Sequence, residues 1–130
     1  MDVVEDHVKD IFGGESIYFG KKKISSLSGI GSIPDGYAIT LEGTPRWYVV
    51  EVELSNHPLM EHIFLQIQKF LIGIDNDVFR RDLISYMDKV VQSQPLTQNL
   101  IKEKFGEVHR FLSDLIYKEP TILIVIRCFA

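Results

Sequence analysis

The feature that most constrains the fold is a pair of β-prone runs that meet at a short turn. The first run covers residues 33–41, the turn reads Glu-Gly-Thr-Pro at 42–45, and the second run covers 46–54. Glycine and proline between two such runs favour an antiparallel hairpin. Side chains alternate between the two faces of a strand, so Glu51 and Glu53 must share a face of the second run. The sequence therefore predicts a hairpin that carries carboxylates on one side.

The remaining elements are predicted from hydrophobic periodicity. Helices are expected over residues 2–13, 58–73, 75–91 and 97–117, and further strands over 16–24 and 121–129. The last run is apolar almost throughout, which is typical of a central strand covered on both faces. We therefore expect residues 121–129 in the middle of the sheet, and an exposed edge position there would remove the basis for the family assignment made below.

Length and composition favour one α/β domain over residues 1–130. A chain of 130 residues with 45% apolar and 25% charged residues is of ordinary globular composition and can bury one core. The order of elements predicts a mixed sheet of about four strands flanked by helices, with residues 75–118 as a helical insertion before the last strand. An apolar strand this close to the last residue suggests that the chain is a domain cut from a longer protein.

Several classes of protein are disfavoured by simple counts. The first residues are acidic, unlike a secretory signal, and no apolar run reaches the ~20 residues that a membrane span requires. One cysteine excludes an internal disulfide, so a reducing, cytoplasmic setting is expected. A net charge of −4 argues against a strongly basic nucleic-acid coat but leaves room for a local basic patch.

The carboxylates of the hairpin suggest a metal site. Asp35 opens the first run and Glu51 lies late in the second, so a hairpin turning at 42–45 makes them neighbours at one end of the sheet. Glu53 projects from the same face as Glu51. Three converging carboxylates require a cation, and Mg²⁺, which prefers oxygen ligands, is the natural one.

These residues resemble the PD-(D/E)XK nuclease superfamily, which has the restriction-endonuclease-like fold. The matching motif is Pro34-Asp35 followed by Glu51-Val52-Glu53, in a helix–strand–strand–strand–helix–strand order of elements. The glycine-rich lead-in at 29–35 looks like that of archaeal Holliday-junction resolvases. The segment 66–70 is similar to the QxxxY element of exonuclease-type members, with Phe in place of Tyr.

The resemblance implies a role for each matched position. Asp35 and Glu51 would be metal ligands, and the backbone carbonyl of Val52 would be a third. Mg²⁺ or Mn²⁺ would be the cofactor and DNA the substrate. Glu5 resembles the glutamate that some members supply from the first helix, although Glu15 competes for that match.

One position departs from the family pattern. Glu53 stands where lysine is usual, and a few restriction enzymes carry glutamate there. Lys69 on the following helix could supply the missing cation, and either residue would assist the attacking water. Gln66 would position substrate. Phosphate contacts are expected from Lys21, Lys22, Lys23, Arg46 and Arg80.

Three functions remain open at this point. The first is a Mg²⁺-dependent deoxyribonuclease, acting as a homodimer or within a longer multidomain chain. The second is an inactive restriction-fold domain that binds nucleic acid or serves in assembly. The third is an unrelated α/β interaction domain, in which Asp35-Gly36 is only a turn signal, Glu51 and Glu53 form the wet face of a half-exposed strand, and Gln66 and Lys69 face solvent.

Overall fold

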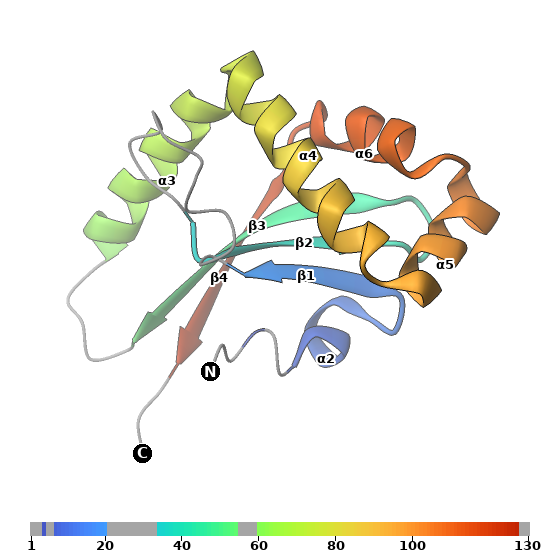
Figure 1. The fold of residues 1–130 in the computed structure, drawn as a ribbon. Coiled ribbons are helices and arrows are strands. Elements are labelled where there is room, and N and C mark those ends of the chain that lie inside the picture. The colour runs from blue at the N-terminus through green and yellow to red at the C-terminus, as the bar shows by residue number, and fades with distance from the viewer. Residues whose placement is uncertain (1–3, 5–6, 21–33, 55–59, 128–130) are drawn as a thin grey trace.

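The computed structural model describes Val4 and residues 7–20, 34–54 and 60–127. Its elements are, in order, α2 (Val8–Phe12), β1 (Ser16–Gly20), β2 (Gly36–Thr40), β3 (Arg46–Leu54), α3 (Met60–Ile74), α4 (Asp77–Gln92), α5 (Pro95–Phe105), α6 (Val108–Ile116) and β4 (Thr121–Arg127). Helices α3 to α6 lie on one side of the sheet and α2 lies on the other (Figure 1). None of the described helices combines the length and apolar character needed to cross a membrane.

The four strands form one mixed sheet in the order β1-β2-β3-β4. The first two pairings are antiparallel and the pairing of β3 with β4 is parallel. A parallel neighbour cannot be reached by a tight turn, so the helices between β3 and β4 serve as the crossover. The predicted α/β class, the mixed sheet and the hairpin between β2 and β3 are confirmed. Gly43 has a φ of +63° at that turn, a left-handed conformation that glycine adopts easily.

The prediction that the last strand is central is wrong. Strand β4 pairs with β3 alone, and no strand in the described part of the chain lies on its other side. Residues 122–125 are half-buried and Ile126 is 57% exposed. The apolar run reflects coverage of both faces of β4, which is a different property from pairing along both of its edges. The condition set for the family assignment, a central last strand, is therefore not met.

The predicted single helix over 97–117 is also wrong, because the structure contains two helices there. Gly106 ends α5 with a φ of +100°, which favours glycine, and Glu107 then caps α6 by accepting hydrogen bonds from two backbone amides. The break turns α6 so that its apolar residues face the sheet. Those residues, all buried, are Val108, Phe111, Leu112, Leu115 and Ile116.

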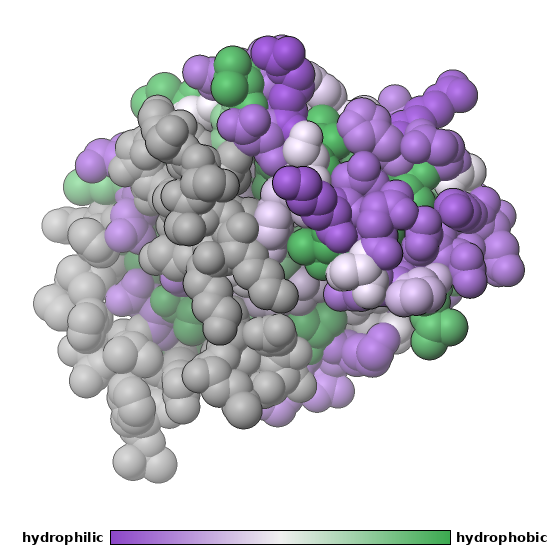
Figure 2. Space-filling view, in the orientation of Figure 1, coloured by the Kyte–Doolittle hydropathy of each residue, from purple (hydrophilic) through white to green (hydrophobic). Residues whose placement is uncertain are grey.

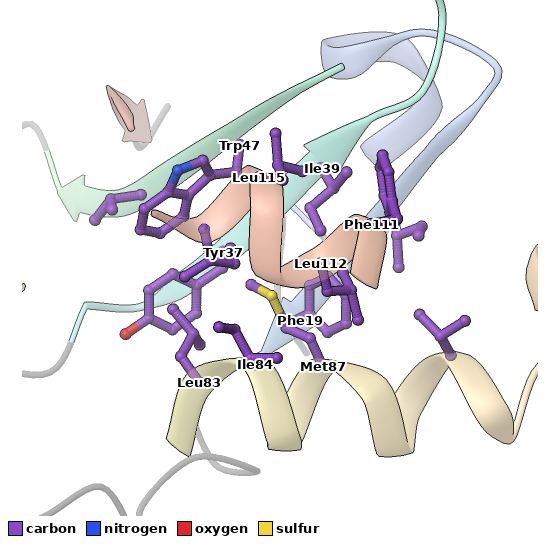
Figure 3. Close-up of a cluster of buried hydrophobic side chains, with 14 of the residues drawn as sticks. Phe19, Tyr37, Ile39, Trp47, Leu83, Ile84, Met87, Phe111, Leu112 and Leu115 are labelled. Atoms are coloured by element: carbon purple, nitrogen blue, oxygen red, sulfur yellow. The ribbon is translucent and has the colours of Figure 1, made fainter. Parts of the chain in front are cut away.

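Two apolar clusters cover the two faces of the sheet. The larger one joins β1, β2 and β3 to the helices on the α3–α6 side, with side chains such as Phe19, Ile39, Met87 and Leu112 in contact (Figure 3). The smaller one lies on the α2 side and contains Val4, Ala38 and Val50. Because both faces are covered, polar groups on β2 and β3 are drawn into partly or fully buried positions.

Candidate functional site

The candidate site lies where β2 begins and β3 continues beyond it. The register pairs Gly36 with Val50, so the preceding residue, Asp35, lies beside Glu51. A hairpin that turns at 42–45 predicts this placement. Glu51 is only 7% exposed. The interpretation of Glu51 as part of a wet strand face is therefore wrong, because helices cover that face of the sheet. Burying a carboxylate costs free energy unless the group is paired or binds a cation. This end of the sheet is therefore the candidate site.

Asp35 is held by the backbone of β3. Its Oδ2 atom accepts a hydrogen bond of 2.7 Å from the Val52 amide. The N–H and C=O of one strand residue point toward the same neighbouring strand in an antiparallel pair. The Val52 carbonyl therefore lies on the same side of β3 as the Asp35 carboxylate. This places a carbonyl and a carboxylate, the ligand types that a hard cation prefers, side by side.

Gly36, next to Asp35, is a strand residue and not a turn residue. It lies inside β2, and a Cβ atom built on it would come within 2.1 Å of the Tyr18 hydroxyl. The Tyr18 side chain occupies the space where a Gly36 side chain would be, and its hydroxyl donates a 3.4 Å hydrogen bond to the Asp35 carbonyl. The interpretation of Asp35-Gly36 as a simple turn signal is wrong. Glycine is needed here because a tyrosine crosses the strand.

Glu53 lies on the same face as Glu51, one side-chain step further along β3. It is half-buried and is paired in register with Ile126 of β4. Two strand residues span roughly 7 Å, which carries Glu53 away from Asp35. Among the described residues, no three carboxylate, histidine or cysteine side chains gather into a group that could hold a metal ion. The predicted convergence of three carboxylates is therefore not met, and the site consists of two carboxylates and a carbonyl.

Tyr37 is the residue of this site that the sequence reasoning missed. It is fully buried, with its ring centroid 6.4 Å from that of Trp47 and 6.2 Å from that of Phe70. Burial, and then the nearby Glu51 carboxylate and Tyr86, raise the pKa of the Tyr37 hydroxyl well above its usual range, so it keeps its proton. An available signal was the alternation of β2, which puts Tyr37 on the same face as Asp35.

The Tyr37 hydroxyl has no hydrogen-bond partner among the described residues. A buried hydroxyl in that state costs about 1–3 kcal/mol relative to a satisfied one. Figure 3 shows the hydroxyl oxygen directed away from the other labelled side chains. Tyr37 therefore supplies a buried hydroxyl at the acidic end of the sheet.

Two predicted site residues lie on α3. Gln66 is half-buried and precedes the buried Phe70 by one helical turn, so both point to the same side of the helix. Lys69 is exposed, and no ion pair between it and a carboxylate is found in the described part of the chain. The structure thus brings Gln66 toward the core and leaves Lys69 on the surface.

Two of the residues predicted to contact phosphate, Arg46 and Arg80, belong to the described part of the chain. Arg46 is exposed at the opposite end of β3, about 17 Å along the strand from Glu51, beside an open pocket that Trp47 and Lys118 also line. Arg80 is a wrong prediction, because it is buried and donates from Nε to the Ile74 carbonyl at 2.7 Å. Its helical spacing from buried Ile84 and Met87 was the available signal. Lys21, Lys22 and Lys23 lie outside the described residues.

Of the two glutamates matched to the first-helix position, only Glu15 belongs to the described residues. Glu5 lies outside the described residues. Glu15, its competitor, forms a 3.0 Å ion pair with Lys104. The Glu15 carbonyl accepts a hydrogen bond from the Leu41 amide, at the far end of β2 from Asp35. Glu15 therefore has a structural role at the other end of the sheet.

Protein-family models, curated proteins and solved structures were each compared with this chain, and none of them matches it.

Proposed function

We propose that this chain is a Mg²⁺- or Mn²⁺-dependent nuclease that hydrolyses DNA phosphodiester bonds. The observation that carries the proposal is the buried Glu51 carboxylate beside Asp35, on a strand whose Val52 carbonyl lies on the Asp35 side. Mg²⁺ is typically held by one or two carboxylates, with waters and substrate phosphate completing its shell, so this donor set fits the ion. A third carboxylate is not required.

The chain's own residues would divide the work as follows. Asp35 and Glu51 would hold the ion, with Asp35 fixed in place by the Val52 amide. When bound, the ion would neutralise phosphate charge and activate water for attack on phosphorus. Gln66 lies on the core side of α3 and would orient the substrate. Glu53, half-buried next along the strand, would accept a proton from the attacking water.

The restriction-endonuclease-like assignment belongs to the same proposal. The order of helix, three strands, helices and strand supports it, as does the placement of Asp35 beside Glu51. The edge position of β4 does not support it. The proposal therefore depends on the chemistry of the acidic end more than on the likeness of the fold.

A second candidate is an inactive domain of the same fold that binds nucleic acid. Two observations favour it: glutamate occupies the position where the family has lysine, and Lys69 remains on the surface. Such a domain would retain DNA binding without hydrolysis. It need not bind a divalent cation, which separates it from the nuclease.

The test is a cleavage assay on linear, circular and branched DNA with Mg²⁺, Mn²⁺ or a chelator. Asp35→Asn and Glu51→Gln keep the side-chain shapes and remove the charges, so each should abolish cleavage and weaken Mn²⁺ binding measured by calorimetric titration. Glu103→Gln, at an exposed position on α5, is the matched control and should change neither. Cleavage that survives in chelator, or in both site variants, would refute the proposal. DNA binding without cleavage or ion binding would favour the second candidate.

A further inference from the structure

Tyr37 combines complete burial with an unsatisfied hydroxyl. Aromatic rings of Trp47 and Phe70 pack around its ring, and phenylalanine would fill the same space. The hydroxyl oxygen is not needed for the packing of the Tyr37 ring against Trp47 and Phe70. It makes no hydrogen bond with any protein group in the described part of the chain, so its presence costs stability unless another molecule satisfies it.

The position of this hydroxyl relative to the carboxylates is fixed by the sheet register. Tyr37 pairs with Val49, which precedes Glu51 by one step on the same face of β3. Asp35 precedes Tyr37 by one step on that face of β2. Diagonal neighbours across an antiparallel pair are within reach of long aromatic side chains. The hydroxyl is directed away from the other labelled side chains (Figure 3).

We propose that Tyr37 is a positioning residue of the cation site, whose hydroxyl oxygen accepts a hydrogen bond from a water molecule in the hydration shell of the divalent ion. This inference rests on the proposed function, because it assumes that Asp35 and Glu51 bind the ion. Mg²⁺ keeps several waters when it binds to proteins. A water bound to the ion through its oxygen directs its hydrogens outward and donates hydrogen bonds to nearby acceptors. A hydroxyl already buried at the site orients such a water without any reorganisation of the protein.

The proposal predicts opposite effects in the absence and presence of the ion. Tyr37→Phe removes an unsatisfied buried hydroxyl, so in chelator its melting temperature should equal or exceed that of the wild type. With the ion bound, the variant lacks the acceptor for the water. Groups that act through the ligands of a metal typically change its affinity by about 10- to 100-fold. We therefore expect Tyr37→Phe to weaken Mn²⁺ binding about tenfold and to reduce the stabilisation that Mn²⁺ confers.

The experiment is a calorimetric titration with Mn²⁺, together with thermal melting in chelator and in excess Mn²⁺. The control is Tyr48→Phe, a tyrosine on the other face of β3 whose ring lies 5.1 Å from that of Phe12. Tyr48→Phe should leave Mn²⁺ affinity unchanged. An unchanged affinity in Tyr37→Phe would overturn this inference while leaving the nuclease proposal intact. Failure of the wild type to bind Mn²⁺ would overturn both.

Discussion

Helices α6 and α3 use their apolar residues in different ways. All five large apolar side chains of α6 are buried, and Leu112 and Ile116 are completely so. In α3, Ile63, Phe70 and Ile74 are buried, whereas four other large apolar residues are exposed. Those four are Phe64 at 61%, Leu65 at 56%, Leu71 at 38% and Ile72 at 75%.

The polar residues of α6 and α3 also differ in how far they are exposed. The residues of α6 between its apolar positions are mostly exposed, and its outer surface is hydrophilic. Helix α3 instead has a half-buried Gln66 on the side of Phe70, whose ring lies 6.2 Å from that of Tyr37. Hydrophobic residues reach the surface near the junction of α3 and α4 (Figure 2). Burial alone therefore accounts for the apolar residues of α6, whereas α3 is suited to contacts beyond the core.

The largest loss of stability is expected from a substitution in the buried face of α6. Leu112→Ala removes a fully buried side chain from the main apolar cluster and leaves a cavity, so we expect a loss of about 3 kcal/mol in the free energy of unfolding. Denaturant unfolding measures it. Leu96→Ala, at an 86% exposed position on α5, is the control and should change the stability by less than about 0.5 kcal/mol. Similar losses in both variants would contradict the description of α6 as a core helix.

The next effect concerns the residue that joins the two helices. Arg80 donates hydrogen bonds to the carbonyls of Ile74, the last residue of α3, and Ile116, the last of α6. A cation there also complements the negative ends of both helix dipoles. Arg80→Leu leaves two carbonyls without a donor, and we expect a loss of roughly 2 kcal/mol.

The matched control for Arg80 is its neighbour. Arg81 is exposed and forms a 3.1 Å ion pair with Asp77. Exposed pairs of this kind contribute about 0–1 kcal/mol, so Arg81→Leu should have little effect on denaturant unfolding. If the two variants lost the same stability, Arg80 would not be the link between α3 and α6.

A smaller effect depends on pH and concerns the start of α6. The Glu107 carboxylate accepts hydrogen bonds from the Arg110 and His109 amides, at 2.8 and 3.1 Å, and these bonds lower its pKa. A lowered folded-state pKa stabilises the fold above the unfolded-state pKa, and that contribution is lost as the pH falls through the folded-state value.

The corresponding variant is Glu107→Gln, which retains the side-chain shape without the charge. It should melt at a lower temperature than the wild type at neutral pH. The difference between the two should shrink as the pH drops below the ordinary range for a glutamate. Glu103→Gln, on the exposed surface of α5, should show no such convergence. A difference that stays constant with pH would exclude the charge as the cause.

The smallest expected effect tests the outer face of α3. Ile72 is 75% exposed, so Ile72→Gln should change the free energy of unfolding by less than about 0.5 kcal/mol. Ile74→Gln, two residues along the same helix, replaces a buried side chain and should be strongly destabilising. Repeating the melts at several protein concentrations separates folding from association. A large loss in Ile72→Gln would mean that this face is covered, which would remove the contrast between α3 and α6.

The parts of the structure that follow from local rules were predictable. Strand β3 has the predicted bounds, 46–54, and Asn76 caps α4 by accepting from the Val78 amide. The placement of Asp35 beside Glu51 followed from the turn, because a hairpin fixes its own register.

The parts that depend on tertiary context were not predictable. An apolar run indicates how many faces of a strand are covered, but it does not give the strand's lateral position, which is why β4 was misplaced. The burial of Glu51 depends on helices that are distant in sequence. Arg80 looks like a surface cation in the sequence, and only the meeting of two helix ends explains its burial.

The parallel pairing of β3 with β4 also has a kinetic consequence. Strands β1, β2 and β3 are neighbours in both sequence and space, so their contacts close short loops. Tyr48 of β3 instead pairs with Thr121 of β4, and four helices separate these two strands in the sequence. Contacts of such long sequence separation slow folding, because loop entropy is lost before they form. We therefore expect β4 to dock late in folding, with the β3 edge open to other partners until then.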